Sequence, residues 1–88
     1  INLHSLSIGN NKLERLSKSI GKLQNLINLD LSNNQLDRLP EEIGELTNLI
    51  ELNLGWNDLE ELPETISNLK NLSSISLSRN INLDIDDT

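Results

Sequence analysis

Residues 26–48 read LINLDLSNNQLDRLPEEIGELTN, and residues 49–71 follow the same pattern as LIELNLGWNDLEELPETISNLKN. Residues 3–25, LHSLSIGNNKLERLSKSIGKLQN, match both stretches at a shift of 23 residues. A fourth unit begins at Leu72 with LSSISLSRN and then departs from the pattern. The pattern therefore predicts one domain, 1–88, with repeats at 3–25, 26–48 and 49–71 and a partial repeat at 72–88. Residues 1–2 match the last positions of a unit, so we expect them to end a further repeat upstream.

The columns shared by these units form the pattern L-x-x-L-x-L-x-x-N-x-L-x-x-L-P-x-x-I-x-x-L-x-N. Apolar and polar residues alternate in its first part, which is typical of a half-buried strand. Pro40 and Pro63 are each followed by an acidic residue, which indicates a helix with Pro at its first position. Gly21 and Gly44 lie inside this segment and weaken it, so we expect 3₁₀ or very short α segments.

One such unit cannot bury its own apolar face, whereas stacked units can, so the repetition predicts a solenoid. Its strands should form a parallel sheet on the inner side, about 4.8 Å apart. The helical segments are wider than the strands and should lie on the outer side, so that the stack curves.

The repeat pattern resembles that of the leucine-rich repeat family, in the 23-residue variety found in bacterial repeat proteins and in Ras-associated scaffold proteins. The resemblance covers residues 1 to about 80. It implies an α/β fold, a right-handed solenoid with about four inner strands and short 3₁₀ or α segments on the convex side. It also implies a module that binds a protein partner without a cofactor, the identity of that partner being open.

The similarity to bacterial proteins that consist only of leucine-rich repeats also bears on location. It favours a secreted or cell-surface location over the cytoplasm, with a role in host contact. A cytosolic scaffold remains the alternative, since the absence of Cys is compatible with every compartment.

A regular column of Asn residues has a structural interpretation and a functional one. Four exposed amides in a row would form a binding ladder. At the bend after each strand, however, the backbone leaves the sheet and its polar groups need partners, which a buried Asn supplies as both donor and acceptor. We therefore assign the column to structure; it comprises Asn11, Asn34, Asn57 and Asn80.

Side chains on the concave side of the sheet and its rim are free to vary, so they are the candidates for partner binding. Most of them are small and polar, with carboxylates near the middle. The predicted binding residues are Asn28, Asp30, Asn33, Glu51, Asn53, Trp56, Asp58, Ser76 and Arg79.

Trp56 is the one aromatic residue of the chain, and it stands in a column with Asn10, Asn33 and Arg79. Because its column neighbours are polar, we expect the ring to face water. An exposed Trp beside an Arg is typical of an interface hot spot. The alternative is a ring that folds over a neighbouring coil or stacks with Arg79 as a cation–π pair, and the two interpretations are compatible.

Composition excludes several other functions. The chain has 14 acidic and 7 basic residues, a net charge of −7 that repels nucleic acid. With no Cys it has no disulfide and no thiolate metal site, and no apolar run is long enough for a membrane span. The single His, His4, has no nearby Cys and is a poor metal site, and without a clustered base it does not complete a serine-protease triad. We therefore expect no catalytic residues, no metal and no cofactor.

Two motifs near the end of the chain have ordinary explanations. Asp84, Asp86 and Asp87 resemble part of a calcium loop, but the Gly and the distal Glu of such a loop are absent. Asn71-Leu72-Ser73 fits a glycosylation acceptor, yet Asn71 also belongs to the repeat column of Asn25 and Asn48.

The ends of the stack suggest an alternative function. The first coil has no predecessor, so it exposes apolar residues and a strand edge. Residues 84–88 are expected to form an irregular C-terminal cap or the start of a frayed end. An uncapped solenoid end can pair with another copy. The alternative to a separate partner is therefore a structural fragment that self-associates through its ends.

Overall fold

A computed structural model describes residues 2–83 of the chain. Ile1 and the C-terminal cap expected at residues 84–88 lie outside this range. Strands alternate with short 3₁₀ helices along the described residues. In chain order the elements are β1 (Ser5–Ser7), η1 (Lys18–Lys22), β2 (Asn28–Asp30), η2 (Glu41–Glu45), β3 (Glu51–Asn53), η3 (Glu64–Asn68) and β4 (Ser74–Ser76).

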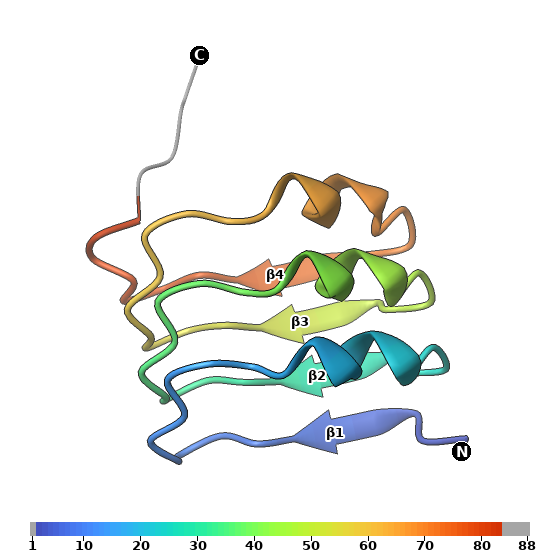
Figure 1. The fold of residues 1–88 in the computed structure, drawn as a ribbon, viewed down its shortest axis with the longest axis horizontal. Helices are drawn as coiled ribbons and strands as arrows, with labels where there is room; N and C mark the ends of the chain where they lie inside the picture. The colour runs from blue at the N-terminus through green and yellow to red at the C-terminus, as the bar shows by residue number, and fades with distance from the viewer. Residues whose placement is uncertain (1, 84–88) are drawn as a thin grey trace.

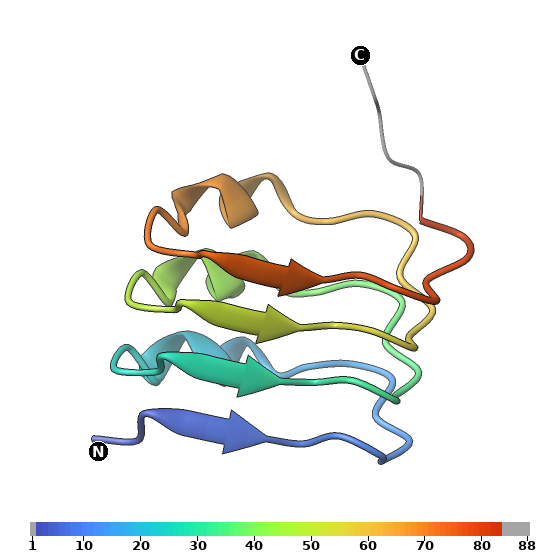
Figure 2. The same cartoon turned by 180° about the vertical axis from the view of Figure 1, so that it is seen from behind.

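The four strands form one parallel sheet in the order β1-β2-β3-β4. Its register follows the repeat, because Leu6 pairs with Leu29, Leu29 with Leu52, and Leu52 with Ile75. The chain winds in a right-handed sense, and the 3₁₀ helices lie in a separate layer on the side opposite the open face of the sheet (Figures 1 and 2). The predicted solenoid, with four inner strands and outer 3₁₀ segments, is confirmed.

The hydrophobic core lies between the sheet and the 3₁₀ helices and is built almost entirely of Leu. Its fully buried members come from the two middle coils, in which each Leu column is covered on both sides. They are Leu26, Leu29, Leu31, Leu36, Ile43, Leu46, Leu49, Leu52, Leu54 and Leu59. In the first coil Leu6, Ile8, Leu13 and Leu16 are only partly buried. Apolar residues are thus fully covered only where a coil lies on each side, as expected for a stacked repeat.

The Asn column pairs backbone groups of successive coils. Nδ2 of Asn57 donates to the carbonyl oxygens of Leu54 in its own coil and of Leu31 in the preceding coil, both at 3.0 Å. Its Oδ1 accepts the backbone N–H of Leu36 at 3.1 Å. Asn34 and Asn80 make the equivalent bonds.

Asn11 differs from the other three members of the column. It is exposed, and among residues 2–83 its Nδ2 donates only within its own coil, to the carbonyl oxygens of Ile8 and Gly9 at 3.1 Å. In the described structure no coil precedes that of Asn11, so there is no earlier backbone for its amide to join.

The predicted position of Pro40 and Pro63 needs a small correction. Both residues precede the helix instead of opening it, because their ψ angles of 153° and 149° are extended. The carbonyl of Pro40 accepts the N–H of Ile43 at 3.1 Å, which makes Pro40 the N-cap. In the first coil the N-cap is Ser17, whose side chain accepts the N–H of Ser19.

Gly44 is required by the close approach of two coils. A Cβ added at Gly44 would lie 2.6 Å from Cβ of Thr65 and 2.7 Å from the carbonyl oxygen of Thr65. Both distances are below the contact limit, and one of the two atoms is backbone. A side chain at this position would therefore push η2 away from η3.

Replacing Asn57 with Leu should lower the free energy of unfolding by about 3 kcal/mol, because buried N–H and C=O groups of two coils lose their partner. Replacing Asn11 with Leu removes only bonds at an exposed site and should change it by less than about 1 kcal/mol. Urea denaturation of both variants measures the difference. Equal losses would contradict a role of the column in joining coils.

Replacing Gly44 with Ala should destabilise the fold by about 2 kcal/mol through overpacking. Gly9 is the matched control, since a Cβ there would lie 3.3 Å from its nearest neighbour, the carbonyl oxygen of Ser32. We expect Gly9→Ala to be close to neutral, because a lower entropy of the unfolded chain offsets a small adjustment. Thermal unfolding of the two variants tests this, and a neutral Gly44→Ala would rule out the contact with Thr65.

Candidate functional site

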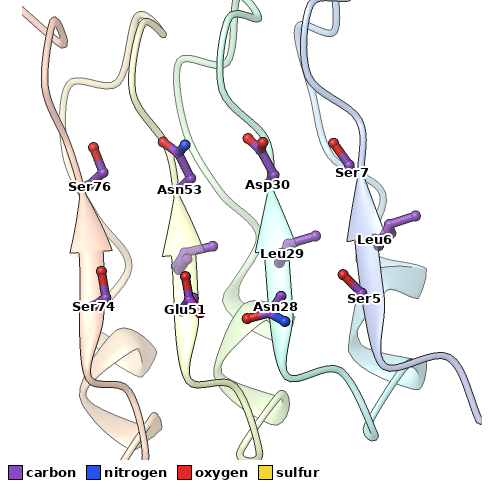
Figure 3. Close-up of a pocket in the computed structure, with 11 residues that line it drawn as sticks. Ser5, Leu6, Ser7, Asn28, Leu29, Asp30, Glu51, Asn53, Ser74 and Ser76 are labelled. Atoms are coloured by element: carbon purple, nitrogen blue, oxygen red, sulfur yellow. The ribbon is translucent and has the colours of Figure 1, made fainter.

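The open face of the sheet carries a shallow hollow of about 450 Å³. Alternation along the strands turns every second side chain away from the core, and the parallel register aligns these side chains across the sheet. Figure 3 shows them in two rows that run across all four strands. One row holds Ser5, Asn28, Glu51 and Ser74, and the other holds Ser7, Asp30, Asn53 and Ser76.

Five of the predicted binding residues line this hollow together: Asn28, Asp30, Glu51, Asn53 and Ser76. Asn33, Trp56 and Arg79 lie beyond the strand ends, three residues after the last residue of β2, β3 and β4. Asp58 lies apart from the hollow, in a separate depression that it shares with Asp37 and Arg15. Repeat position therefore predicted correctly that five of these residues lie together. Asp58 lies on another side of the coil because the loop turns away after the strand.

Asp30 and Asn53 serve the fold as well as the surface. Oδ1 of Asp30 accepts the N–H and the hydroxyl of Ser32, at 3.0 and 2.6 Å. Oδ1 of Asn53 accepts the N–H of Gly55 at 3.0 Å. These three bonds stabilise the turns after the two strands, so substitutions at Asp30 and Asn53 must keep a side-chain oxygen.

The charged groups of the hollow are all negative. Asp30 and Glu51 are its only ionisable lining residues among residues 2–83. The ion pairs in that range join Asp37 to Arg15 and Arg38, on a different side of the coil. The hollow therefore carries negative charge without a cation of this chain beside it.

Trp56 is 56% exposed, and the guanidinium carbon of Arg79 lies 5.1 Å from the centre of its ring. The predicted stacking with Arg79 is therefore confirmed, and the ring still presents a large apolar surface to solvent. At an exposed site such a cation–π pair contributes about 0.5–1 kcal/mol.

The backbone at this column is left-handed. The φ angles of Asn10, Asn33, Trp56 and Arg79 lie between 57° and 63°. Asn adopts this conformation readily, whereas a bulky Trp rarely does. Trp56 and Arg79 therefore occupy positions for which Asn is the better residue.

A second hollow of about 450 Å³ lies at the opposite, N-terminal ends of the strands. It is lined by His4, Ile27 and Ile50 together with Asn25, Asn48 and Asn71. Nδ2 of Asn48 donates to the carbonyl oxygen of Gln24 at 3.0 Å, and Nδ2 of Asn71 donates to that of Thr47 at 2.9 Å.

This second series of amides joins neighbouring coils in the same way as the buried one. In the sequence these residues appear as the repeat column Asn25, Asn48 and Asn71. The column indicates that the positions are equivalent, but it does not reveal their hydrogen bonds. Asn71 of the glycosylation motif is therefore exposed, and its side-chain amide already donates a hydrogen bond to the backbone carbonyl of Thr47.

Neither a metal centre nor a membrane-spanning helix is found between residues 2 and 83. No group of three or more His, Cys, Asp or Glu side chains in that range is placed to hold a metal ion. None of the helices described there has the length and apolar character that crossing a bilayer requires.

Comparison with known proteins agrees with this architecture. A family model for a leucine-rich repeat region matches residues 1–86. Among solved structures 28 chains match, and one of them, a leucine-rich repeat protein of Leptospira interrogans, gives a TM-score of 0.86 at 50% sequence identity over 86% of this chain. The match covers 19% of that protein's chain, so this chain spans about a fifth of its length. A comparison with curated proteins found no match.

Trp56→Asn should be more stable than Trp56→Ala by about 0.5–1 kcal/mol, because Asn tolerates the left-handed backbone better. Both variants lose the ring and its stacking with Arg79, so their difference isolates the backbone preference. Urea denaturation with an unchanged m-value measures it. Equal midpoints would show that the backbone at residue 56 relaxes out of the left-handed region.

Proposed function

The chain belongs to the leucine-rich repeat family, and on that premise we propose that it binds a protein partner through the concave face of its sheet and the adjoining rim. Members of this family are generally non-enzymatic modules for protein–protein interaction. The proposed site consists of the hollow over β1–β4 and the pair of Trp56 and Arg79.

The exposed Trp56 is the observation that carries the proposal. An aromatic ring that is 56% exposed, in a backbone conformation unfavourable for it, contributes little to the fold through burial. Rigid aromatic side chains beside Arg are enriched among residues that dominate binding energy. The polar lining of the adjacent hollow then supplies adaptable hydrogen bonds.

The size of the surface predicts the strength of binding. Four strands span about 14 Å across three strand spacings. A standard interface buries about 800 Å² on each partner, which is more than so narrow a sheet offers. We therefore expect weak binding by this chain alone, strengthened where further repeats or several copies bind at once.

Self-association through the ends is the second candidate function, and one observation favours it. Within the described range, 2–83, Asn11 lacks the inter-coil bonds that its column forms elsewhere, and at the other end of the stack Ile75 and Ile81 are 41% and 88% exposed. A second copy stacked end to end would supply backbone partners for Asn11 and cover Ile75 and Ile81. In that case Trp56 would have no part in assembly.

Affinity capture tests the proposal. The immobilised chain is exposed to host extracellular proteins and, separately, to a bacterial lysate, which also tests the predicted secreted or surface role. Retained proteins are quantified by mass spectrometry. We expect a protein that binds the wild type to be lost with the double variant Trp56→Ala, Arg79→Ala, and with Asn28→Arg, which fills the hollow.

Asn68→Arg is the matched control, because it makes the same substitution on an exposed residue of η3, in the outer layer. It should retain the partner, and all variants must unfold at similar temperatures. If every variant retains the same protein, the concave face is not the site. If the chain captures only itself and does so equally with Trp56 replaced, self-association is the better description.

A further inference from the structure

The two carboxylates of the hollow are diagonal neighbours on adjacent strands. Glu51 on β3 lies opposite Asn28, and Asp30 on β2 lies opposite Asn53. Diagonal side chains on one face of a sheet have their Cβ atoms roughly 7–8 Å apart. An ammonium or guanidinium group that enters between these two side chains therefore meets a carboxylate on each side.

No cation within the described residues compensates this pair. Within residues 2–83, the side chain of Glu51 has neither a hydrogen bond nor an ion pair. Asp30 uses Oδ1 for Ser32, which leaves its second oxygen for a ligand. Arg15 and Arg38 pair with Asp37, while Arg79 stacks on Trp56.

The rest of the hollow suits the same kind of group. Its other polar side chains are neutral, and their hydroxyl and amide oxygens can accept the several N–H donors of an arginine. They are Ser5, Ser7, Asn28, Asn53, Ser74 and Ser76. A carboxylate or phosphate would meet two negative charges in this space, so the hollow disfavours acidic partners.

Charge over the two middle coils acts in the same direction, whereas residues 3–25 contain one acidic and four basic residues. Residues 26–71 contain ten acidic residues and two basic ones. Such a field attracts a basic partner from a distance and weakens with salt. Asp30 and Glu51 would then determine the position at which the cationic side chain binds.

We propose that the hollow between Asp30 and Glu51 receives an arginine or lysine side chain of a basic protein segment, with arginine preferred for its fork of N–H donors. This inference rests on the proposed function and specifies the chemistry of the partner at the same site.

The repeat indicates which substitutions can test this inference without disturbing the fold, because Asn53 is the equivalent of Asp30 in the next coil. Asp30→Asn keeps the oxygen that accepts the N–H of the turn, as Asn53 does in the next coil. Combined with Glu51→Gln, it removes both charges and little volume. Because the two carboxylates have no partners of opposite charge, this double variant should be at least as stable as the wild type.

The experiment selects random peptides displayed on phage against the immobilised chain, and four proteins are compared. They are the wild type, Asp30→Asn with Glu51→Gln, Asn28→Arg, and Glu41→Gln with Glu45→Gln. The last has the same change of net charge on exposed residues of η2, in the outer layer. Affinities of the selected peptides are then measured at low salt and at about 1 M NaCl, where charges are screened beyond about 3 Å.

We expect wild-type binders to be enriched in Arg and Lys and to bind the Asp30, Glu51 double variant about tenfold more weakly, as for two ion pairs at a partly exposed site. The η2 control should bind them almost as well as the wild type, and high salt should reduce the difference between the two double variants.

Three results would overturn the inference, and they separate it from the proposed function. Peptides that are lost with Asn28→Arg but bind equally without the two carboxylates would leave the concave site in place and exclude cation recognition. Basic peptides that weaken equally with the η2 control would indicate a general effect of net charge. Peptides indifferent to every concave substitution, or no selected peptide at all, would overturn both proposals.

Discussion

The side-chain amide of the buried Asn at each strand exit is the interaction on which the rest of the structure depends. At that bend the backbone leaves the sheet, so N–H and C=O groups of two coils would be buried without partners. Asn57 pairs with three such groups at once, in its own coil and in the preceding one. Because the bonds to the preceding coil recur at Asn34 and Asn80, they hold the register that carries through the whole sheet.

That register also creates the surface. Positions that point inward must be Leu or Ile to fill the stack, whereas positions that point outward have no packing partner and are free to vary. Asp30 and Asn53 use one oxygen for the turn and remain on the open face. Trp56 and Arg79 depart furthest from the local rule, since they take left-handed positions that Asn holds in the first two coils. Such departures are expected where a surface has a function.

Sequence reasoning identified the coil, its strands and the outer 3₁₀ segments, because period-2 alternation and the repeat are local properties. It placed Pro40 one position too far into the helix, since φ of Pro is fixed while ψ is not. It explained Gly44 by helix weakness alone, because the contact with Thr65 lies in another coil. Five residues of the predicted site do lie together in one hollow, while Asp58 lies elsewhere.

The sequence by itself determined which side chains face the core and which share a column, because both follow from backbone geometry repeated every 23 residues. Only the tertiary structure decided what each member of a column does. Asn11 and Asn57 have the same place in the repeat, yet one is exposed and the other is buried. The tertiary structure also brought the carboxylates of Asp30 and Glu51 together in one hollow that has no basic residue of the described chain in its lining. These properties depend on which coils are neighbours and on distances between residues far apart in the chain, which no local pattern contains.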